Sequence, residues 1–113
     1  MPLDVTDLSG VENFTARAIE RFGGVDILAA IAGGAAMYQP IDEIDPDCWT
    51  RVINVNLIGT FHSVRAVLPA MRKKNAGSIL TCTGGGAFHP MLGINATDYA
   101  TAKAGLCRLT DQL

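Results

Sequence analysis

The best candidates for a chemical role in this sequence are a tyrosine and a lysine four positions apart. Residues 99–103 read Tyr-Ala-Thr-Ala-Lys. On a helix, side chains four residues apart lie on one face, so the Tyr99 phenol and the Lys103 ammonium would stack. Opposite charges about 4 Å apart attract by roughly 4 kcal/mol at an effective dielectric constant of 20, so the lysine favours the phenolate. Tyr99 can then act as a general acid or base near neutral pH. The alternative is a chance pair on a helix, because this spacing also occurs in unrelated proteins.

A hydroxyl and an amide are the next candidates. Thr83 ends the apolar run at residues 78–83, where its hydroxyl can donate a hydrogen bond to a substrate oxygen. The alternative for Thr83 is a β-forming residue that only ends a strand. Asn56 interrupts an apolar helical stripe and needs a partner there, which favours a functional role. Asn54, two residues earlier, is better explained as a solvated or capping residue.

The remaining polar clusters have structural explanations. Acidic residues from Asp42 to Asp47 cluster at the N-terminus of a predicted helix, where the helix dipole favours anions, and basic residues 72–74 lie at its C-terminal end, where cations are favoured. His62 has no carboxylate at triad-like spacing, and His89 is expected to be a solvated loop residue. The cysteines, which lack CxxC spacing and are expected to be buried, are Cys48, Cys82 and Cys107. We therefore expect neither a metal site nor disulfides.

Hydrophobic periodicity predicts alternating helices and strands. The expected elements are a helix at 11–22, a strand at 25–32, a long helix from Pro46 to about 74, a strand at 78–83 and a helix from about Thr97. The spacing of Ser9 and Glu12 predicts a capping box at the first helix. Asp45 before Pro46 is an N-cap signal for the second, which we expect to bend near Gly59 or Pro69.

This order of elements is typical of a doubly wound parallel sheet, so we expect residues 1–113 to form a single, partial Rossmann-like α/β domain. Both apolar runs are predicted to be strands buried on two faces. Glycines 33–34 and 84–86 follow these strands, at the edge where such sheets bind ligands. Two strands make a poor sheet by themselves, which indicates that strands are missing.

Composition excludes several classes of function. Nine Lys and Arg against eleven Asp and Glu leave no basic excess for nucleic acid. No apolar run approaches the roughly 20 residues that a membrane span needs, and residues 1–7 lack the order of a signal peptide. We therefore expect a cytoplasmic protein that binds neither nucleic acid nor membranes.

Several segments occur in the order and spacing of one large enzyme family. They read DVTD at 4–7, VDIL at 25–28 with AG at 32–33, WTRVINVNLIG at 49–59, GSIL at 77–80 and YATAKAG at 99–105. The chain thus resembles the short-chain dehydrogenases/reductases. The resemblance implies a partial NAD(P)-binding domain that moves a hydride between NAD or NADP and an alcohol or carbonyl substrate.

The resemblance also implies roles for individual residues. Tyr99 would be the proton donor or acceptor, and Lys103 would bind the nicotinamide ribose and tune Tyr99. Asn56 would order a proton-relay water. The dinucleotide would contact Asp4 and Val5 at its adenine and the small residues Ala32 and Gly33 near its nicotinamide.

Three departures from the family pattern stand out. Gly84 occupies the usual position of a catalytic serine, so the neighbouring Thr83 is assigned that role. Ala30 and Ile31 replace a pair of asparagines, and the Gly-rich turn that receives the pyrophosphate is absent. We therefore expect the central part of a homo-oligomer-forming enzyme of about 250 residues that pairs through its long and final helices. The alternative is a non-catalytic remnant or a helix-mediated interaction module.

Overall fold

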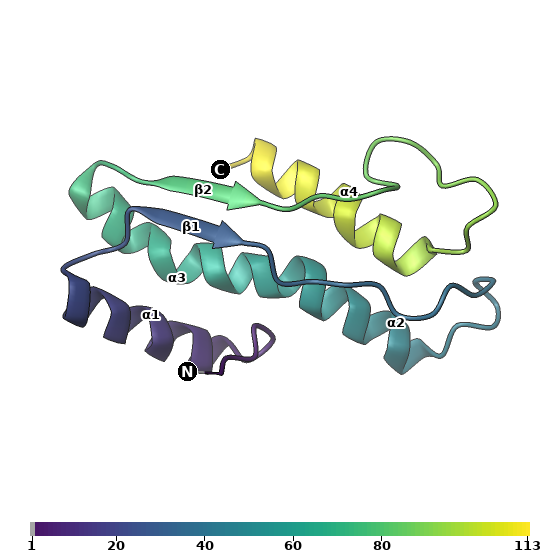
Figure 1. Ribbon diagram of the computed structural model, residues 1–113, viewed down its shortest axis with the longest axis horizontal. Coiled ribbons are helices and arrows are strands. Elements are labelled where there is room, and N and C mark those ends of the chain that lie inside the picture. Colours follow the sequence, from purple (N-terminus) through teal and green to yellow (C-terminus); the bar gives the residue numbers. More distant parts are fainter. Residues whose placement is uncertain (1) are drawn as a thin grey trace.

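The computed structural model describes residues 2–113 as alternating helices and strands (Figure 1). The elements are α1 (Leu8–Phe22), β1 (Ile27–Ala30), α2 (Pro46–Ile53), the π-helical turn η1 (Asn54–Ile58), α3 (Gly59–Lys74), β2 (Ser78–Thr81) and α4 (Thr97–Asp111). β1 and β2 pair in parallel, with Ile27 opposite Ser78 and Ala30 opposite Thr81. This arrangement confirms the predicted partial Rossmann-like fold, with strands shorter than the apolar runs suggested.

A nearly continuous helical segment formed by α2, η1 and α3 runs along the molecule (Figure 1). α1 packs against α3, and α4 packs against α2 and η1. In Figure 1, α1 and α4 therefore flank this segment on opposite sides. α4 meets η1 near its middle, where a Cβ on Gly105 would stand 3.1 Å from Leu57 Cδ2.

The strands are covered on one face only, so the prediction that both faces are buried was wrong. Along β1, exposed Ile27 and Ala29 alternate with half-buried Leu28 and buried Ala30. Leu80 of β2 is likewise 58% exposed. Successive side chains of a strand point to opposite faces, and the α3 helix that contacts β1 covers only one of them. The strands therefore carry more apolar surface than the described helices cover.

Local sequence signals set most helix ends. The Asp45 side chain accepts hydrogen bonds from the backbone N–H groups of Asp47 (2.7 Å) and Cys48 (3.4 Å), as an N-cap before Pro46 should. α1 ends at Gly23, whose φ of 82° is left-handed. The predicted capping box was wrong, because α1 begins at Leu8 and Ser9 donates to the Asp7 carboxylate at 2.8 Å.

A π-helical turn interrupts the long helix just before Gly59, one of the two positions at which a bend was predicted. In η1, the Gly59 N–H bonds to Asn54 O, and Pro69 lies inside α3 without ending it. A Cβ on Gly59 would stand 2.6 Å from Val5 Cγ2, so this glycine lets the segment before α1 approach the helix. Such turns are often found at functional sites, and this one contains Asn56.

The cysteines differ from the prediction of burial. Cys82 is exposed, and Cys48 and Cys107 are half-buried. Cys82 lies just beyond β2, on the line of side chains that faces away from the helices. No described helix has the length and apolarity that a membrane crossing requires.

Candidate functional site

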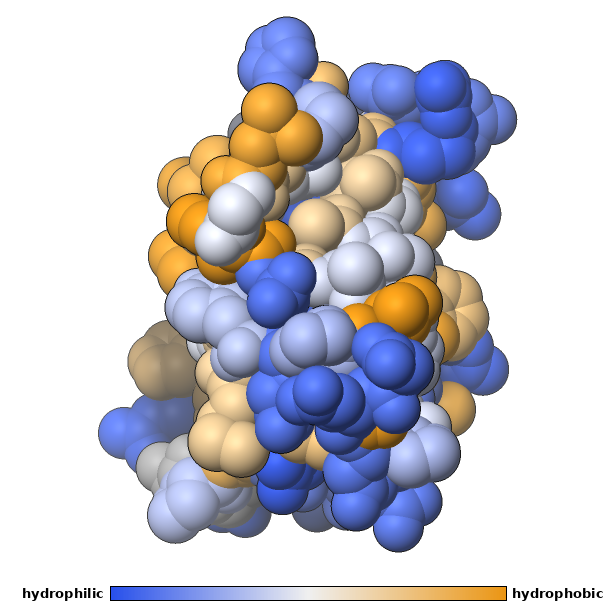
Figure 2. Space-filling view, turned by 90° about the vertical axis from the view of Figure 1, so that its right-hand side faces the viewer, coloured by the Kyte–Doolittle hydropathy of each residue, from blue (hydrophilic) through white to orange (hydrophobic). Residues whose placement is uncertain are grey.

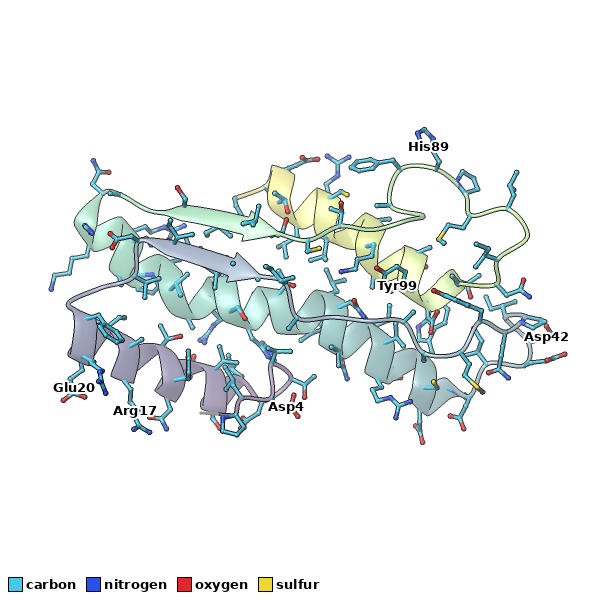
Figure 3. All side chains as sticks on the ribbon, viewed as in Figure 1. Asp4, Arg17, Glu20, Asp42, His89 and Tyr99 are labelled. Atoms are coloured by element: carbon cyan, nitrogen blue, oxygen red, sulfur yellow. The ribbon has the colours of Figure 1, made fainter. Side chains whose placement is uncertain are left out.

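The predicted pairing of Tyr99 and Lys103 is present in α4. Both residues lie in its first two turns, and Lys103 Nζ is 5.5 Å from the centroid of the Tyr99 ring. Lys103 is only 3% exposed and donates from Nζ to the Cys82 carbonyl at 2.8 Å. Figure 3 places Tyr99 near the start of α4. The ammonium is thus held beside the phenol by a carbonyl just beyond β2.

The Tyr99 hydroxyl lies against Gly84. A Cβ built on Gly84 would stand 2.5 Å from Tyr99 Oη, closer than such atoms approach one another in proteins. Gly84 also begins a turn, closed by the Ala87 N–H bonding to Gly84 O at 3.2 Å, in which Gly86 has a φ of 83°. Thr83 is half-buried one position earlier. The Tyr99 hydroxyl therefore packs against Gly84, the position at which the resemblance led us to expect a serine.

Asn56 is fully buried and has the partners that its position demanded. Its Nδ2 donates to Gly34 O (2.7 Å) and Val52 O (2.9 Å), and its Oδ1 accepts the Gly34 N–H (3.1 Å). A Cβ on Gly33 would stand 2.5 Å from Asn56 Oδ1 and 3.4 Å from Lys103 Nζ. The structure therefore brings Gly33, Asn56 and Lys103 together, with Ala32 exposed beside them.

Asp4 and Val5 lie with the start of α3 rather than with Tyr99. The Asp4 carboxylate accepts hydrogen bonds from the Thr6 N–H (2.9 Å) and hydroxyl (2.7 Å). These bonds, the backbone one first, lower the pKa of Asp4 below its ordinary 3.8. The Val5 carbonyl lies 3.0 Å from Nδ1 of buried His62, which gives that histidine a structural role. Figure 3 shows Asp4 well apart from Tyr99.

Sequence reasoning missed two residues of this site, Asp98 beside Tyr99 and Met91 on the glycine turn. Asp98 is 2% exposed, and its Oδ1 accepts the Tyr99 N–H at 2.7 Å. An acidic residue in the first turn of a helix was the available signal. Met91 packs on the glycine turn, where its Sδ would lie 3.0 Å from a Cβ on Gly86 and 3.3 Å from one on Gly85. That contact joins two loop positions, and no local pattern indicates it.

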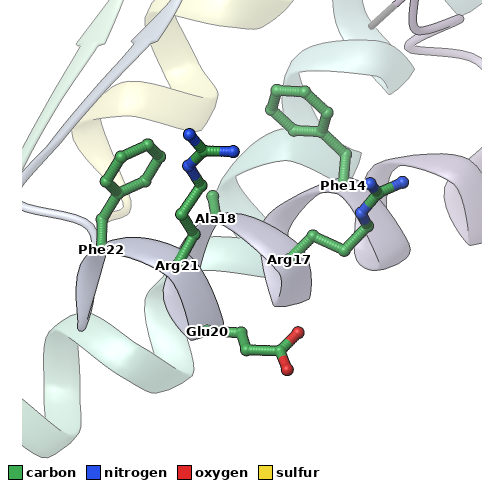
Figure 4. A pocket seen from close by; sticks show the side chains of 6 residues that line it. All are labelled: Phe14, Arg17, Ala18, Glu20, Arg21 and Phe22. Carbon is green, nitrogen blue, oxygen red and sulfur yellow. The ribbon is translucent and has the colours of Figure 1, made fainter.

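Two hollows in the surface of the described residues differ in their relation to this site: one lies away from it and one borders it at Gly33. One of about 530 Å³ is formed by α1 alone, between the side chains of Phe14 and Phe22 (Figure 4). Another, of about 340 Å³, is lined by residues 33–36 of the loop after β1 and by Arg51, Val52 and Val55 of the helical segment. The first is remote from Tyr99 in sequence and in packing, so the side-chain contacts, and not the depth of a hollow, define the candidate site.

Comparisons with known proteins identify the family of this chain. The family model described as short chain dehydrogenase matches residues 1–113. D-beta-hydroxybutyrate dehydrogenase of Rhizobium meliloti (strain 1021) is 34% identical over 109 residues, which are 96% of this chain and 41% of that protein. Short chain dehydrogenase mpl6 of Monascus purpureus is 36% identical over 110 residues, 97% of this chain and 37% of that protein.

Solved structures show the same likeness. Levodione reductase superimposes with a TM-score of 0.92 at 29% identity and covers 97% of this chain and 42% of its own. NAD+-bound xylitol dehydrogenase has a TM-score of 0.90 at 27% identity, again with 97% and 42% covered. The chain thus spans less than half the length of these relatives. The match over all 113 residues shows that the chain belongs to the short chain dehydrogenase family.

Proposed function

We propose that this chain forms the proton-transfer and nicotinamide-binding part of an NAD(P)-dependent oxidoreductase that interconverts an alcohol and a carbonyl compound. The observation that carries the proposal is the convergence of Tyr99, Lys103 and Gly33 with buried Asn56 beyond the carboxyl ends of β1 and β2. This is the edge at which sheets of this type bind ligands.

The residues present fit the nicotinamide end of a dinucleotide. Lys103 has three N–H donors, of which one is directed at Cys82 O, so the others remain for ribose hydroxyls. Ala32 and Gly33 are exposed and small, so a ring can approach their backbone. Asp4 and Val5 would contact the adenine, consistent with their distance from Tyr99. When bound, the nicotinamide would supply or accept the hydride.

Tyr99 would move the proton. Its hydroxyl would donate to the carbonyl oxygen during reduction and accept from the alcohol during oxidation. The Lys103 ammonium, 5.5 Å from the centroid of the Tyr99 ring, would stabilise negative charge that develops on the phenol oxygen in the transition state. Asp98, which accepts the Tyr99 backbone N–H, would hold the start of α4 in place.

Asn56 and Thr83 would complete the site. Both N–H groups of the Asn56 side chain already donate to carbonyl groups. Asn56 would therefore assist the proton relay by holding the backbone at Gly34 in place and by accepting a hydrogen bond at the remaining lone pair of Oδ1. The Thr83 hydroxyl would polarise the substrate carbonyl, because Gly84 has no hydroxyl to do so.

Deuterium transfer tests this proposal. The protein, as its source organism makes it, would be given NADH or NADPH deuterated at the transferable position together with a panel of ketones. We expect deuterium on the carbinol carbon of the product, detected by mass spectrometry. Oxidation of neither cofactor with any ketone would contradict the proposal. In the same assay, loss of rate in Thr83→Val would support the role given to its hydroxyl.

Assembly and location follow from the family resemblance and from the surface of α3. We propose a cytoplasmic homo-oligomer that pairs through the long helical segment and α4, as the family resemblance implies. The support from this chain is an exposed apolar side chain on α3, Phe61, with 44% of its surface accessible. Light scattering of the purified protein would show a single species of twice the monomer mass or more, and a monomer would contradict the proposal.

A further inference from the structure

The turn formed by residues 4–7 is held from outside by α3. The Asp7 N–H bonds to Asp4 O at 3.2 Å and closes a β-turn with Val5 and Thr6 as its central residues. The bond that closes such a turn does not involve the central peptide, which here consists of the Val5 carbonyl and the Thr6 N–H. The orientation of this peptide differs between turn types, so its outside contacts decide how it lies.

Both ends of the central peptide have partners. His62 on α3 is 9% exposed, and its Nδ1 lies 3.0 Å from Val5 O. Because a carbonyl only accepts hydrogen bonds, Nδ1 is the ring nitrogen that carries the proton. On the other side, the Thr6 N–H donates to Asp4 Oδ1 at 2.9 Å. The C=O and N–H of a trans peptide point in opposite directions, so the peptide reaches from the imidazole to the carboxylate.

Gly59 adds a second contact between α3 and the turn. It lies three positions before His62, so the two residues share one face of the helix. A Cβ on Gly59 would stand 2.6 Å from Val5 Cγ2 and 3.4 Å from Val5 O. Both the side chain and the carbonyl of Val5 therefore lie against the helix, and the hydrogen bond from His62 sets the direction of the carbonyl.

We infer that His62 is a positioning residue for the adenine half of the dinucleotide, because it fixes the peptide that orients the Asp4 carboxylate. This inference rests on the proposed function, in which Asp4 and Val5 contact adenine, and adds a residue to which the resemblance assigns no role. Adenine carries an amino group that donates hydrogen bonds. Both Thr6 bonds go to Asp4 Oδ1, so Oδ2 would accept from that amino group.

The turn lies apart from the loops that follow the strands. Those loops carry exposed apolar side chains, among them Tyr38 (56%) and Phe88 (73%). Figure 2 views this end of the molecule, and hydrophobic side chains gather at its upper left. Figure 3 shows Asp4 well away from Tyr99. A change at His62 should therefore act on the adenine half of the dinucleotide and leave the nicotinamide half unaltered.

The titration of Asp4 tests the inference without cofactor. The Thr6 N–H, and after it the Thr6 hydroxyl, lower the pKa of Asp4. In the protein as its source organism makes it, His62→Leu should release the peptide, weaken the bond from the Thr6 N–H and raise the pKa of Asp4 toward 3.8. His62→Asn should keep this pKa low, because the asparagine Nδ2 can donate to Val5 O from the position of the imidazole Nδ1.

Asp7 controls for the charge that both substitutions remove. The pKa of Asp7 is lowered first by the Ser9 hydroxyl and, among smaller causes, by the charge of His62. Loss of the imidazolium should therefore raise the pKa of Asp7 alike in His62→Leu and His62→Asn, whereas only His62→Leu should move Asp4. Equal behaviour of Asp4 in the two variants, whether shifted or unshifted, would overturn the inference.

Calorimetry then tests the effect on the cofactor. NADH and NADPH would be compared with reduced nicotinamide mononucleotide, which lacks the adenine half. We expect His62→Leu to weaken dinucleotide binding about tenfold and mononucleotide binding less than about twofold, and His62→Asn to restore dinucleotide affinity to within about threefold. His89→Leu, at an exposed loop histidine, is the matched control and should alter neither. Equal weakening of both ligands in His62→Leu would contradict a role confined to adenine.

A measurement on the unsubstituted protein covers the case in which His62→Leu does not fold. Correlation of the ring ¹⁵N and ¹H signals of neutral His62 should place its proton on Nδ1. A proton on Nε2 instead would leave Val5 O without its donor and would overturn the inference. Failure of the unsubstituted protein to bind any of the nucleotides would count against the proposed function, and the Asp4 titration would still decide whether His62 orients the peptide.

Discussion

Asn56 holds Gly34 by both of its backbone groups, accepting its N–H at 3.1 Å and donating to its carbonyl at 2.7 Å. The same side chain also donates to Val52 O, in α2 just before the π-helical turn. Asn56 thus ties the loop after β1 to the long helical segment. Through this link, the backbone beside Gly33 is held next to Lys103.

Removal of this link should be costly. Asn56→Ala deletes three hydrogen bonds of a fully buried side chain, one of them to the buried Val52 carbonyl, so we expect a loss of about 3 kcal/mol in the free energy of unfolding. Urea denaturation measures this value. Asn54→Ala, at a half-buried position two residues earlier, is the control and should change it by no more than about 0.5 kcal/mol. Equal effects of the two substitutions would show that Asn56 has no special role.

Gly84 should be intolerant of any side chain. A Cβ there would be 2.5 Å from Tyr99 Oη, so Gly84→Ala must displace the phenol. Because a misplacement of about 1 Å can cost about 10²-fold in rate, we expect a loss of turnover of this order. Gly85→Ala is the control, since its Cβ would meet only the mobile end of Met91 at 3.3 Å. A Gly84→Ala protein with unchanged turnover would contradict the close packing of Gly84 and Tyr99.

Lys103 should affect both cofactor binding and turnover. Lys103→Met keeps much of the buried aliphatic chain but removes the ammonium that contacts Cys82 O and lies beside the Tyr99 ring. We expect weaker binding of NAD(P)H, measured by calorimetry, and a lower kcat at saturating cofactor. Lys73→Met, on an exposed lysine of the last turn of α3, should alter neither property. Unchanged cofactor affinity in Lys103→Met would refute the role given to the ammonium.

Asp4 should titrate below its ordinary value of 3.8, because the Thr6 N–H and hydroxyl bond to its ionised form. A lowered pKa in the folded state means that this carboxylate contributes stability at neutral pH, and the contribution is lost as the pH falls through that pKa. Carboxyl ¹³C shifts followed with pH give the value. Thr6→Ala should raise the pKa of Asp4 in part, since the backbone bond remains, whereas Thr6→Ser should leave it low. No difference between these variants would contradict the hydroxyl contribution.

Local signals predicted the parts of the fold that depend on local interactions. Asp45 and Pro46 start α2, Gly23 ends α1, and the spacing of Tyr99 and Lys103 puts both on one face of α4. The exposure of β1 was not predicted, because an apolar run shows what a strand can bury and not how many neighbours cover it. The capping box failed because Asp7 competes successfully for the Ser9 hydroxyl.

The contacts of the site depend on long-range packing and were less accessible from sequence. An isolated polar residue in an apolar stripe showed that Asn56 needs partners, but nothing local identified Gly34, 22 positions away, as the main one. Likewise, the family pattern has a serine at the position of Gly84. That its Cα lies against Tyr99 Oη follows only from how the turn after β2 meets α4.

The central claim, that Tyr99 is the proton-transfer group, is tested most directly by comparing Tyr99→Phe with Tyr38→Phe. Each substitution removes one hydroxyl and keeps the ring, and Tyr38 is an exposed residue of the loop after β1. Turnover of a neutral ketone and calorimetric binding of NAD(P)H would be measured for both. We expect Tyr99→Phe to lower kcat by about 10³-fold, with cofactor affinity changed by less than about threefold, and Tyr38→Phe to retain kcat. A Tyr99→Phe protein that retains kcat within about threefold of the unsubstituted protein would contradict the claim.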